Sequence, residues 1–188
     1  MNKISEYDVK DPLFDEKHGV LKNKLSIKDS EKLETIEIKH LLKAYEKAAL
    51  EYSENHKFTE KDICYIHKLF FGDIYKWAGK YRNIDISSEK MRYCHAVYIP
   101  QNMKTFSNEL YQLTPFKPEL PRQEILQRLA KIHGDLIIIH PFRDGNGRTT
   151  RLLCDLLLMQ AEYKALDTTI FYDKSFIKKY HQAIQNLW

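Results

Sequence analysis

Hydrophobic residues recur at three- and four-residue intervals along most of the chain, which is the spacing of amphipathic helices. The pattern predicts helices over about 30–52, 59–79, 103–113, 122–139, 149–163 and 174–188. The segment 149–163 is apolar on nearly every side, as is typical of a central, buried helix. We therefore expect a mainly α fold, a bundle of about six helices.

Two segments depart from the helical pattern. Residues 1–25 show sparse periodicity and predict an irregular N-terminal arm laid over the domain. Residues 84–99 begin with apolar and polar positions in alternation, and Tyr93, Val97 and Tyr98 favour strands, so a short β-hairpin is expected there. The chain has no internal repeat, low-complexity tract or composition shift, and we expect one domain over 1–188.

Composition narrows the class of protein. With 43% hydrophobic and 30% charged residues, the 188-residue chain fits a globular domain. Its net charge of +4 is too small to indicate a kind of partner. Its three cysteines are an odd number without metal-ligand spacing, which favours a reducing compartment over a disulfide framework. The N-terminus lacks an apolar signal core, and no apolar run approaches the roughly 18 residues that span a bilayer. We expect a cytoplasmic protein with no membrane partner; a secreted effector is the less favoured alternative.

Candidate chemistry concentrates in residues 140–151, which read HPFRDGNGRTTR between two helical patterns. Gly145 and Gly147 can adopt positive φ, and backbone N–H groups before a helix can converge on an anion. This arrangement is typical of a phosphate-binding turn. The alternative is a plain joint between two helices.

Two arginines follow the glycines. Arg148 and Arg151 lie three residues apart on the first turn of the expected helix, and arginine binds phosphate in a bidentate manner. Cations at a helix N-terminus oppose the helix dipole by roughly 0.3–1 kcal/mol each. A bound polyphosphate would explain this unfavourable placement; a solvated helix face is the alternative.

The remaining polar residues of the loop each have two interpretations. Asp144 is a natural Mg²⁺ ligand or the acceptor of a turn bond. Asn146 would contact a phosphate oxygen or cap the following helix. His140, with a reference pKa near 6.5, suits a general base at the entrance of the site, although a lone histidine at a helix end is often structural.

Other conspicuous side chains in and before the loop receive structural roles. Phe142 is expected to anchor the loop to the core, and Arg143 is expected to face solvent. His67 and His133 lie on apolar helix faces, where histidines are most often structural.

The loop resembles the signature of the Fic family, His-Pro-Phe-x-[Asp/Glu]-Gly-Asn-Gly-Arg-x-x-Arg, and all nine specified positions are filled here. Residues 19–25 resemble the N-terminal stretch of that family, and residues 77–82 (WAGKYR) resemble its second landmark. The expected hairpin at 84–99 occupies the place of the family's flap.

The resemblance implies a Fic fold and the activity of a protein adenylyltransferase, a nucleotidyltransferase. ATP would lie in the loop with Mg²⁺ on Asp144. His140 would deprotonate a Ser, Thr or Tyr hydroxyl of a target protein, which would take AMP from ATP. The flap would hold the target segment as an added strand.

The resemblance also implies which loop residues contact the nucleotide. They are Gly145 and Gly147 through backbone amides, Asn146 at the α-phosphate, Arg148 at the β-phosphate and Arg151 at the γ-phosphate.

The chain departs from the family pattern in three places. Ser26 stands where glycine is usual, and Tyr93 where the flap often carries phenylalanine. Many members also have an inhibitory helix, [Ser/Thr]-x-x-x-Glu-[Gly/Asn], whose glutamate pairs with the second motif arginine. Ser30 and Glu34 have that spacing, but Thr35 follows, and the segment aligns with the ordinary first helix. We expect the inhibitory helix beyond the C-terminus or in an antitoxin-like partner protein.

Three alternatives remain. The same site could use another donor or direction, such as phosphocholine transfer or de-AMPylation; phosphotransfer is disfavoured because the Doc-like loop has lysine in place of Gly147. The chain could instead be a toxin-like module held inactive by a partner. Nucleic-acid binding is disfavoured, since no basic stripe interleaved with aromatic residues appears.

Overall fold

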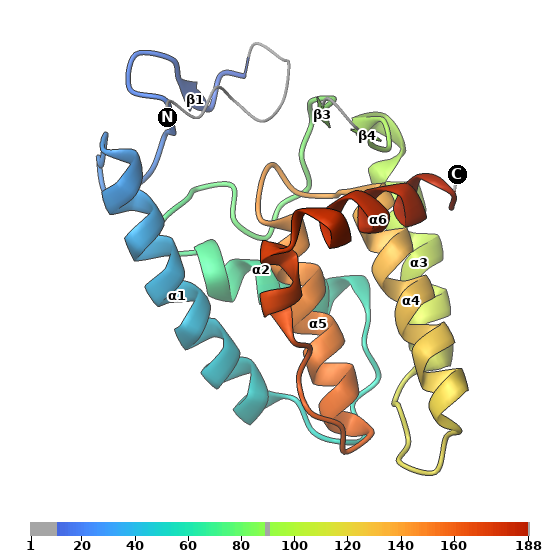
Figure 1. Cartoon of the computed structure of the whole chain (residues 1–188). Helices are drawn as coiled ribbons and strands as arrows, with labels where there is room; N and C mark the ends of the chain where they lie inside the picture. Colours follow the sequence, from blue (N-terminus) through green and yellow to red (C-terminus); the bar gives the residue numbers. More distant parts are fainter. Residues whose placement is uncertain (1–10, 89–90, 188) are drawn as a thin grey trace.

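The computed structural model describes residues 11–88 and 91–187, and its architecture is a bundle of helices with two small hairpins at one end (Figure 1). The mainly α fold with about six helices is confirmed. In the described residues the α-helices are α1 Ser30–Glu51, α2 Glu60–Phe71, α3 Ile99–Leu113, α4 Arg122–Ile139, α5 Asn146–Gln160 and α6 Lys174–Gln185.

Helix α5 is the buried centre of the bundle, as its nearly uniform apolar sequence predicts. It packs against α1, α2 and α4 (Figure 1), and its buried side chains include Leu152, Leu153, Leu156 and Leu157. Because the loop 140–145 joins α4 to α5, it is held between two helices that pack on each other.

Five predicted helix boundaries were wrong, among them the ends of α5 and α6, which lie at Gln160 and Gln185 rather than near 163 and 188. Helix α2 ends at Phe71 rather than near 79, although Ile74 and Trp77 are still buried. Turns follow the helix there, with hydrogen bonds such as Ile74 N–H to Phe71 O at 2.9 Å. The apolar residues are spaced as in a helix because they are buried, not because the segment is helical. Helix α3 begins at Ile99 with Pro100 in its first turn, a position that needs no helical N–H. Helix α5 begins at Asn146 rather than at 149.

The two hairpins lie on either side of the α4–α5 loop at the upper end of Figure 1. In the arm, β1 (Phe14–Asp15) pairs antiparallel with β2 (Val20–Leu21), so this segment is less irregular than predicted. In the flap, β3 (Ser87–Ser88) pairs antiparallel with β4 (Met91–Arg92). The predicted hairpin at 84–99 is thus present but shorter, because residues Ala96–Tyr98 form a 3₁₀ turn.

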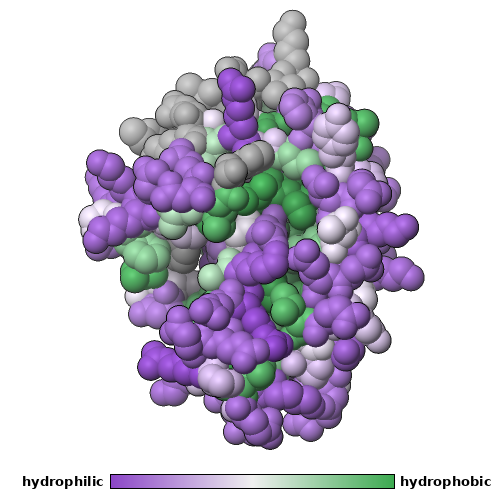
Figure 2. Space-filling view, turned by 90° about the vertical axis from the view of Figure 1, so that its right-hand side faces the viewer, coloured by the Kyte–Doolittle hydropathy of each residue, from purple (hydrophilic) through white to green (hydrophobic). Residues whose placement is uncertain are grey.

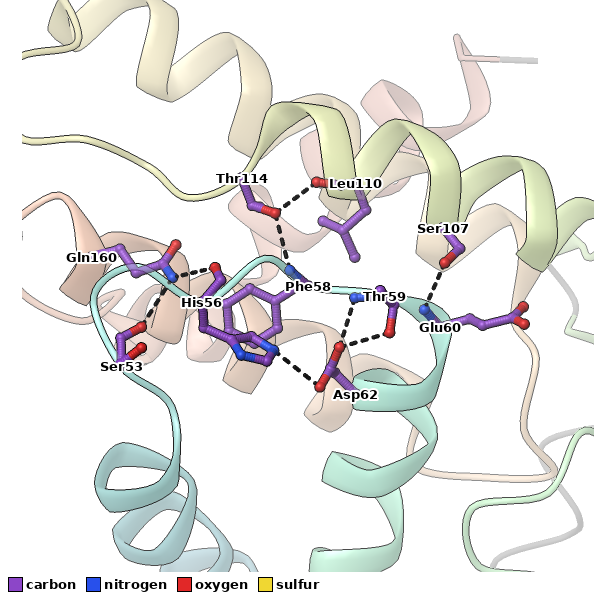
Figure 3. Close-up of polar contacts among 10 residues, drawn as sticks. All are labelled: Ser53, His56, Phe58, Thr59, Glu60, Asp62, Ser107, Leu110, Thr114 and Gln160. Atoms are coloured by element: carbon purple, nitrogen blue, oxygen red, sulfur yellow. Dashed lines mark hydrogen bonds and ion pairs between the residues drawn. The ribbon is translucent and has the colours of Figure 1, made fainter.

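A polar network at the opposite end joins the α1–α2 connection to α3 and α5 (Figure 3). Gln160 Nε2 donates to the carbonyl oxygens of Ser53 and His56 at 3.3 and 2.8 Å. The buried N–H of Phe58 donates to Thr114 Oγ1 at 3.0 Å, and that hydroxyl donates to Leu110 O at 2.8 Å. These hydrogen bonds give partners to backbone groups around the buried Phe58, which would otherwise lack both water and a protein partner.

Replacing Thr114 by valine should therefore lower the free energy of unfolding by about 1–3 kcal/mol, because it leaves the N–H of Phe58 buried without an acceptor. Urea denaturation measures the change. Thr105→Val is the matched control: this exposed threonine of α3 donates to the carbonyl oxygen of Gln101 at 3.2 Å. Equal effects of the two substitutions would contradict the assigned role.

The side of the molecule on which α3 and α4 lie is largely hydrophilic, with smaller hydrophobic patches between polar side chains (Figure 2). Scattered exposed apolar residues are ordinary on folded proteins. Within 11–88 and 91–187, each helix is too short or too polar to cross a bilayer.

Candidate active site

A cavity of about 570 Å³ lies at the α4–α5 loop, within the range of small-molecule sites. Its walls come from the arm, from α1, from the segment after β4 and from the loop itself. The seven site residues predicted from the sequence all line it: His140, Asp144, Gly145, Asn146, Gly147, Arg148 and Arg151.

His140 is the C-cap of α4, in the left-handed conformation with φ of 50°. Its backbone N–H donates to Leu136 O at 3.0 Å, and its ring nitrogen Nδ1 lies 3.0 Å from Ile137 O. Because a carbonyl oxygen only accepts, Nδ1 carries the proton in the neutral imidazole and the lone pair is on Nε2. The Tyr93 ring stacks on the imidazole, with 3.7 Å between ring centroids.

Burial lowers the pKa of His140 to about 3, although the Ile137 carbonyl opposes this shift. The pKa of His140 thus lies well below the reference value near 6.5, because the residue is only 7% exposed. The imidazole is consequently neutral, and in the proton-accepting form, throughout the physiological pH range.

Gly145 forms the tight turn of the loop and caps α5 with a φ of 78°. A Cβ at this position would lie 2.1 Å from the Phe71 ring, so only glycine fits. Its N–H donates to Asp144 Oδ1 at 2.5 Å. Gly147, in contrast, has no left-handed backbone; its missing side chain leaves room for the Arg151 guanidinium, which a Cβ would approach to 3.3 Å.

Asn146 braces the loop rather than capping the helix, so the capping interpretation was wrong. Its Oδ1 accepts from Phe142 N–H and its Nδ2 donates to Phe142 O, both at 2.8 Å. Phe142 is buried beneath the loop, as expected for an anchor, and stacks on the His67 ring at a centroid distance of 3.9 Å.

Arg143 was expected to face solvent, and this expectation was wrong. The side chain is 5% exposed, and its Nε donates to the buried carboxylate of Asp11 in the arm. The pair joins the N-terminal arm to the active-site loop. A sequence pattern could not reveal it, because the two residues are 132 positions apart.

Two further residues hold the loop and were not predicted to do so. Arg82, at the end of the second landmark, donates to the carbonyls of His140 and Ile84 at 2.8 and 2.7 Å, and also to Cys94 O. It therefore ties the backbone of His140 to both sides of the flap. The signal was its place in the WAGKYR motif, which the resemblance singled out without assigning a role.

His67 is the second of these residues. Its Nε2 lies 3.0 Å from Asp144 O, and its Nδ1 accepts the N–H of Gly79 at 2.8 Å. Burial lowers its pKa to about 4, so one neutral tautomer satisfies both bonds. The structural role expected for His67 thus includes fixing the backbone at Asp144.

Arg148 projects from α5 between two carboxylates. Its Nη1 donates to Glu37 Oε2 at 2.8 Å, and its Nη2 lies 3.3 Å from Asp144 Oδ2. The guanidinium also lies over the Phe70 and Phe71 rings, 4.8 and 5.0 Å from their centroids. Burial opposes its charge, but the two carboxylates hold the pKa of Arg148 above its usual value.

The part of the chain that the structure describes holds no cluster of three or more His, Cys, Asp or Glu suited to a metal. A cation at the loop would instead have one protein carboxylate, that of Asp144, whose side chain is 31% exposed and lines the cavity. One carboxylate with phosphate and water oxygens is a common Mg²⁺ environment, so the residues fit this ion.

The fold and the site define a class: helical proteins with an anion-binding loop at the N-terminus of a central helix, beside a histidine. The model of the Fic/DOC family matches residues 57–158, and the chain belongs to that family. The recognition made from the loop signature is confirmed.

Curated relatives carry the name of one activity. The chain is 34% identical to "Protein adenylyltransferase VbhT" of Bartonella schoenbuchensis over 81% of its length, and 30% identical to "Probable protein adenylyltransferase y4lH" of Sinorhizobium fredii over 90%. It covers 85% of the Sinorhizobium protein but 32% of VbhT, and 50% of a Salmonella typhimurium relative that is 31% identical. The chain thus spans less than two thirds of two of these three relatives.

Solved structures share the fold. The BepC protein of Bartonella tribocorum, solved with bound AMPPNP, superposes with a TM-score of 0.72 at 25% identity, covering 89% of this chain and 85% of BepC. The FIC domain of Bep5 from Bartonella clarridgeiae gives a TM-score of 0.75 at 21% identity, covering 99% and 88%.

Proposed function

We propose that this protein is a protein adenylyltransferase, which transfers AMP from ATP to a Ser, Thr or Tyr hydroxyl of a target protein. The observation that carries the proposal is the convergence of His140 and the signature residues on one cavity. The names of the curated relatives support the same reaction.

His140 is the proposed general base. The hydroxyl proton passes to Nε2 while the hydroxyl oxygen attacks the α-phosphorus; the bond to the bridging oxygen of pyrophosphate breaks, and AMP remains on the target. The Nδ1–H bond to Ile137 O fixes the tautomer that this step needs. The negative charge of a bound nucleotide would raise the low pKa of His140 and so strengthen the base.

The position of the loop at the start of α5 supports the nucleotide contacts proposed for it. The N-terminus of α5 presents backbone N–H groups and the positive end of the helix dipole to the cavity. The proposed contacts are the amides of Gly145 and Gly147, Asn146 and the α-phosphate, Arg148 and the β-phosphate, and Arg151 and the γ-phosphate.

Asp144 is the proposed ligand of Mg²⁺, which would neutralise phosphate charge when bound with ATP. Its carboxylate accepts from Gly145 N–H and contacts Arg148 Nη2. Both partners are hydrogen-bond donors, so phosphate oxygens could accept from them in place of the Asp144 carboxylate, which would then be free to bind the metal.

Asp144→Asn should raise the Mg²⁺ concentration that gives half-maximal AMP transfer by at least about tenfold, since even losing a partner of a metal ligand costs about 10–100-fold in affinity. Titrating Mg²⁺ in the transfer assay measures it. The control is Glu34→Gln, which removes a carboxylate from the same cavity but outside the loop. An unchanged Mg²⁺ requirement in the asparagine variant would contradict the assignment of Asp144 as a metal ligand.

The flap is the proposed docking place of the target. Its β3–β4 ladder is short, and Tyr93 follows β4 directly and lies against His140. An extended target segment paired with the flap would therefore bring its hydroxyl to the base. Backbone pairing sets register more than sequence specificity, which is consistent with a target chosen by other surfaces.

We also propose that an inhibitory partner protein of the antitoxin type acts on this site. Arg151, the second motif arginine, lines the cavity, as do Ser30 and Glu34 at the start of α1. A partner helix that placed a glutamate against Arg151 would exclude the γ-phosphate. Copurification of a small protein with the native chain, released by Arg151→Ala, is the expected observation.

The overall proposal is tested by incubating the chain with ATP labelled in its adenine or α-phosphate and with a cell extract or its own polypeptide as the target. Mass spectrometry of the labelled protein should show the mass of AMP. The mass of phosphocholine, or loss of AMP from a pre-modified target, would identify one of the alternative reactions instead.

A further inference from the structure

Glu37 is a buried residue that lies outside the signature loop, but its carboxylate contacts Arg148 of that loop. It is on α1, 9% exposed, and lines the cavity. Its Oε2 accepts from Arg148 Nη1 at 2.8 Å, and its Oε1 accepts from the Tyr75 hydroxyl at 2.5 Å. Burial and the charge of Glu37 raise the pKa of Tyr75, so that hydroxyl stays a donor. Both oxygens of the carboxylate are thus held.

The two carboxylates beside Arg148 differ in how firmly they are placed. The Glu37 side chain is 11% exposed and held by Tyr75 from another segment, whereas that of Asp144 is 31% exposed, bonded to its neighbour Gly145 N–H and 3.3 Å from the guanidinium. Asp144 also lies in the loop where a phosphate and its cation would enter. Glu37 is therefore the lasting partner of Arg148, and Asp144 is the exchangeable one.

Orientation of Arg148 needs more than the ring contacts. The Phe70 and Phe71 rings pack against the guanidinium and favour a cation, but a ring face does not choose which N–H points where. The bond from Nη1 to Glu37 makes that choice, because it leaves the Nη2 end directed toward Asp144 and the loop.

We propose that Glu37 is a positioning residue for nucleotide binding: it holds Arg148 by Nη1 so that the Nη2 end is presented to the β-phosphate before the nucleotide arrives. The inference rests on the proposed function, in which Arg148 contacts the β-phosphate. The class of ligand is a nucleoside di- or triphosphate. A nucleoside lacks the β-phosphate, so the affinity for nucleosides should not depend on Glu37. Preorganised arginines lose less conformational freedom on binding and so bind more tightly.

The opposite role, in which Glu37 competes with phosphate for Arg148, predicts the opposite result. Removing a competing negative charge from the cavity would tighten ATP binding. Removing a positioning charge weakens it, because the guanidinium can then rotate toward other acceptors. The direction of the change in affinity therefore decides between the two roles.

The experiment measures the Kd of Mg-ATP and of adenosine by calorimetry on the full chain. Glu37→Gln should raise the Kd of ATP by about fivefold to thirtyfold, the size of a coupling of about 1–2 kcal/mol between neighbouring groups, and leave the Kd of adenosine unchanged. Glu34→Gln is the matched control, since Glu34 lines the same cavity one helical turn earlier and makes no ion pair among the described residues. Its Kd for ATP should stay within about twofold or fall.

A double-mutant cycle separates the inference from the function on which it rests. In an Arg148→Ala background, Glu37→Gln should cause no further loss of ATP affinity. If Arg148→Ala alone leaves ATP binding unchanged, the proposed β-phosphate contact is wrong. If Arg148→Ala weakens ATP binding while Glu37→Gln leaves it unchanged or tightens it, the positioning role is overturned.

A second variant keeps the test valid if Glu37→Gln disturbs the fold, which a weaker affinity for adenosine would reveal. Tyr75→Phe removes only the hydroxyl that anchors Glu37 Oε1. It should raise the Kd of ATP in the same direction by a smaller factor, without affecting adenosine. Native ATP affinity in a folded Tyr75→Phe protein would show that this anchor does not act on Arg148, and would overturn the proposal.

Discussion

Replacing His140 by asparagine is expected to slow AMP transfer by about 10²–10⁴-fold, the usual contribution of a general base. Asparagine is preferred to alanine because it tolerates the left-handed backbone found at this position, with φ of 50°. It can neither accept the hydroxyl proton nor stack on Tyr93 as an imidazole does. Single-turnover transfer from labelled ATP measures the rate.

The variant should still bind Mg-ATP, since His140 is not among the proposed nucleotide contacts. That result distinguishes a lost base from a lost site. His40→Asn on α1 is the matched control, a partly buried histidine that is not among the residues lining the cavity. If the His140 variant transfers AMP at the native rate, the base assignment is wrong.

Acid should destabilise the protein well above the pH at which carboxylates titrate. Three histidines, the buried His67 and His140 and the partly buried His133, are neutral: burial lowers the pKa of His67 and His133 to about 4 and that of His140 to about 3. In the unfolded chain each has a pKa near 6.5. Above pH 6.5 both states are neutral, and below it only the unfolded chain takes up protons.

The consequence is a stability that is full above pH 6.5 and falls as the pH drops toward 4. Each of the three histidines contributes a slope of up to about 1.4 kcal/mol per pH unit in that window. Urea midpoints between pH 7.5 and 5 should therefore decrease steeply at constant m-value. Below about pH 4, where the native histidines also protonate, their contribution to the slope ends.

One substitution checks the cause of this acid sensitivity. His133, between Cys154 and the Tyr180 hydroxyl, is not among the residues lining the cavity, so His133→Gln removes one titrating group from outside the loop. The slope should fall by about a third. A flat stability between pH 7.5 and 5 would contradict the assignment of buried neutral histidines.

The sequence allowed a good prediction of the elements and of the loop, and the reasons are local. The bounds of α1 and α4 follow from periodicity and flanking residues, such as the Asp29 side chain that caps Lys32 N–H at 2.8 Å. The residues of the loop signature are adjacent in sequence, so they necessarily lie close together in space. Boundary errors occurred where burial continued without helix, as after Phe71.

The parts of the site that were missed share a different property. Glu37 reaches Arg148 across 111 positions, His67 reaches Asp144 across 77, and Arg143 reaches Asp11 across 132. Each of these residues looked ordinary in its own segment, where a glutamate, histidine or arginine is compatible with a helix or turn. No local pattern encodes such pairs.

By itself the sequence determined the helical class, the chemistry of the loop and the order of its residues along the chain, because periodicity and motif spacing act over a few residues. Only the tertiary structure decided how that chemistry is tuned. Packing made His140 neutral by burial, turned Arg143 inward to hold the arm, and placed Glu37 against Arg148. Desolvation and ion pairing depend on which distant segments share one space, so they exist only once the chain has folded.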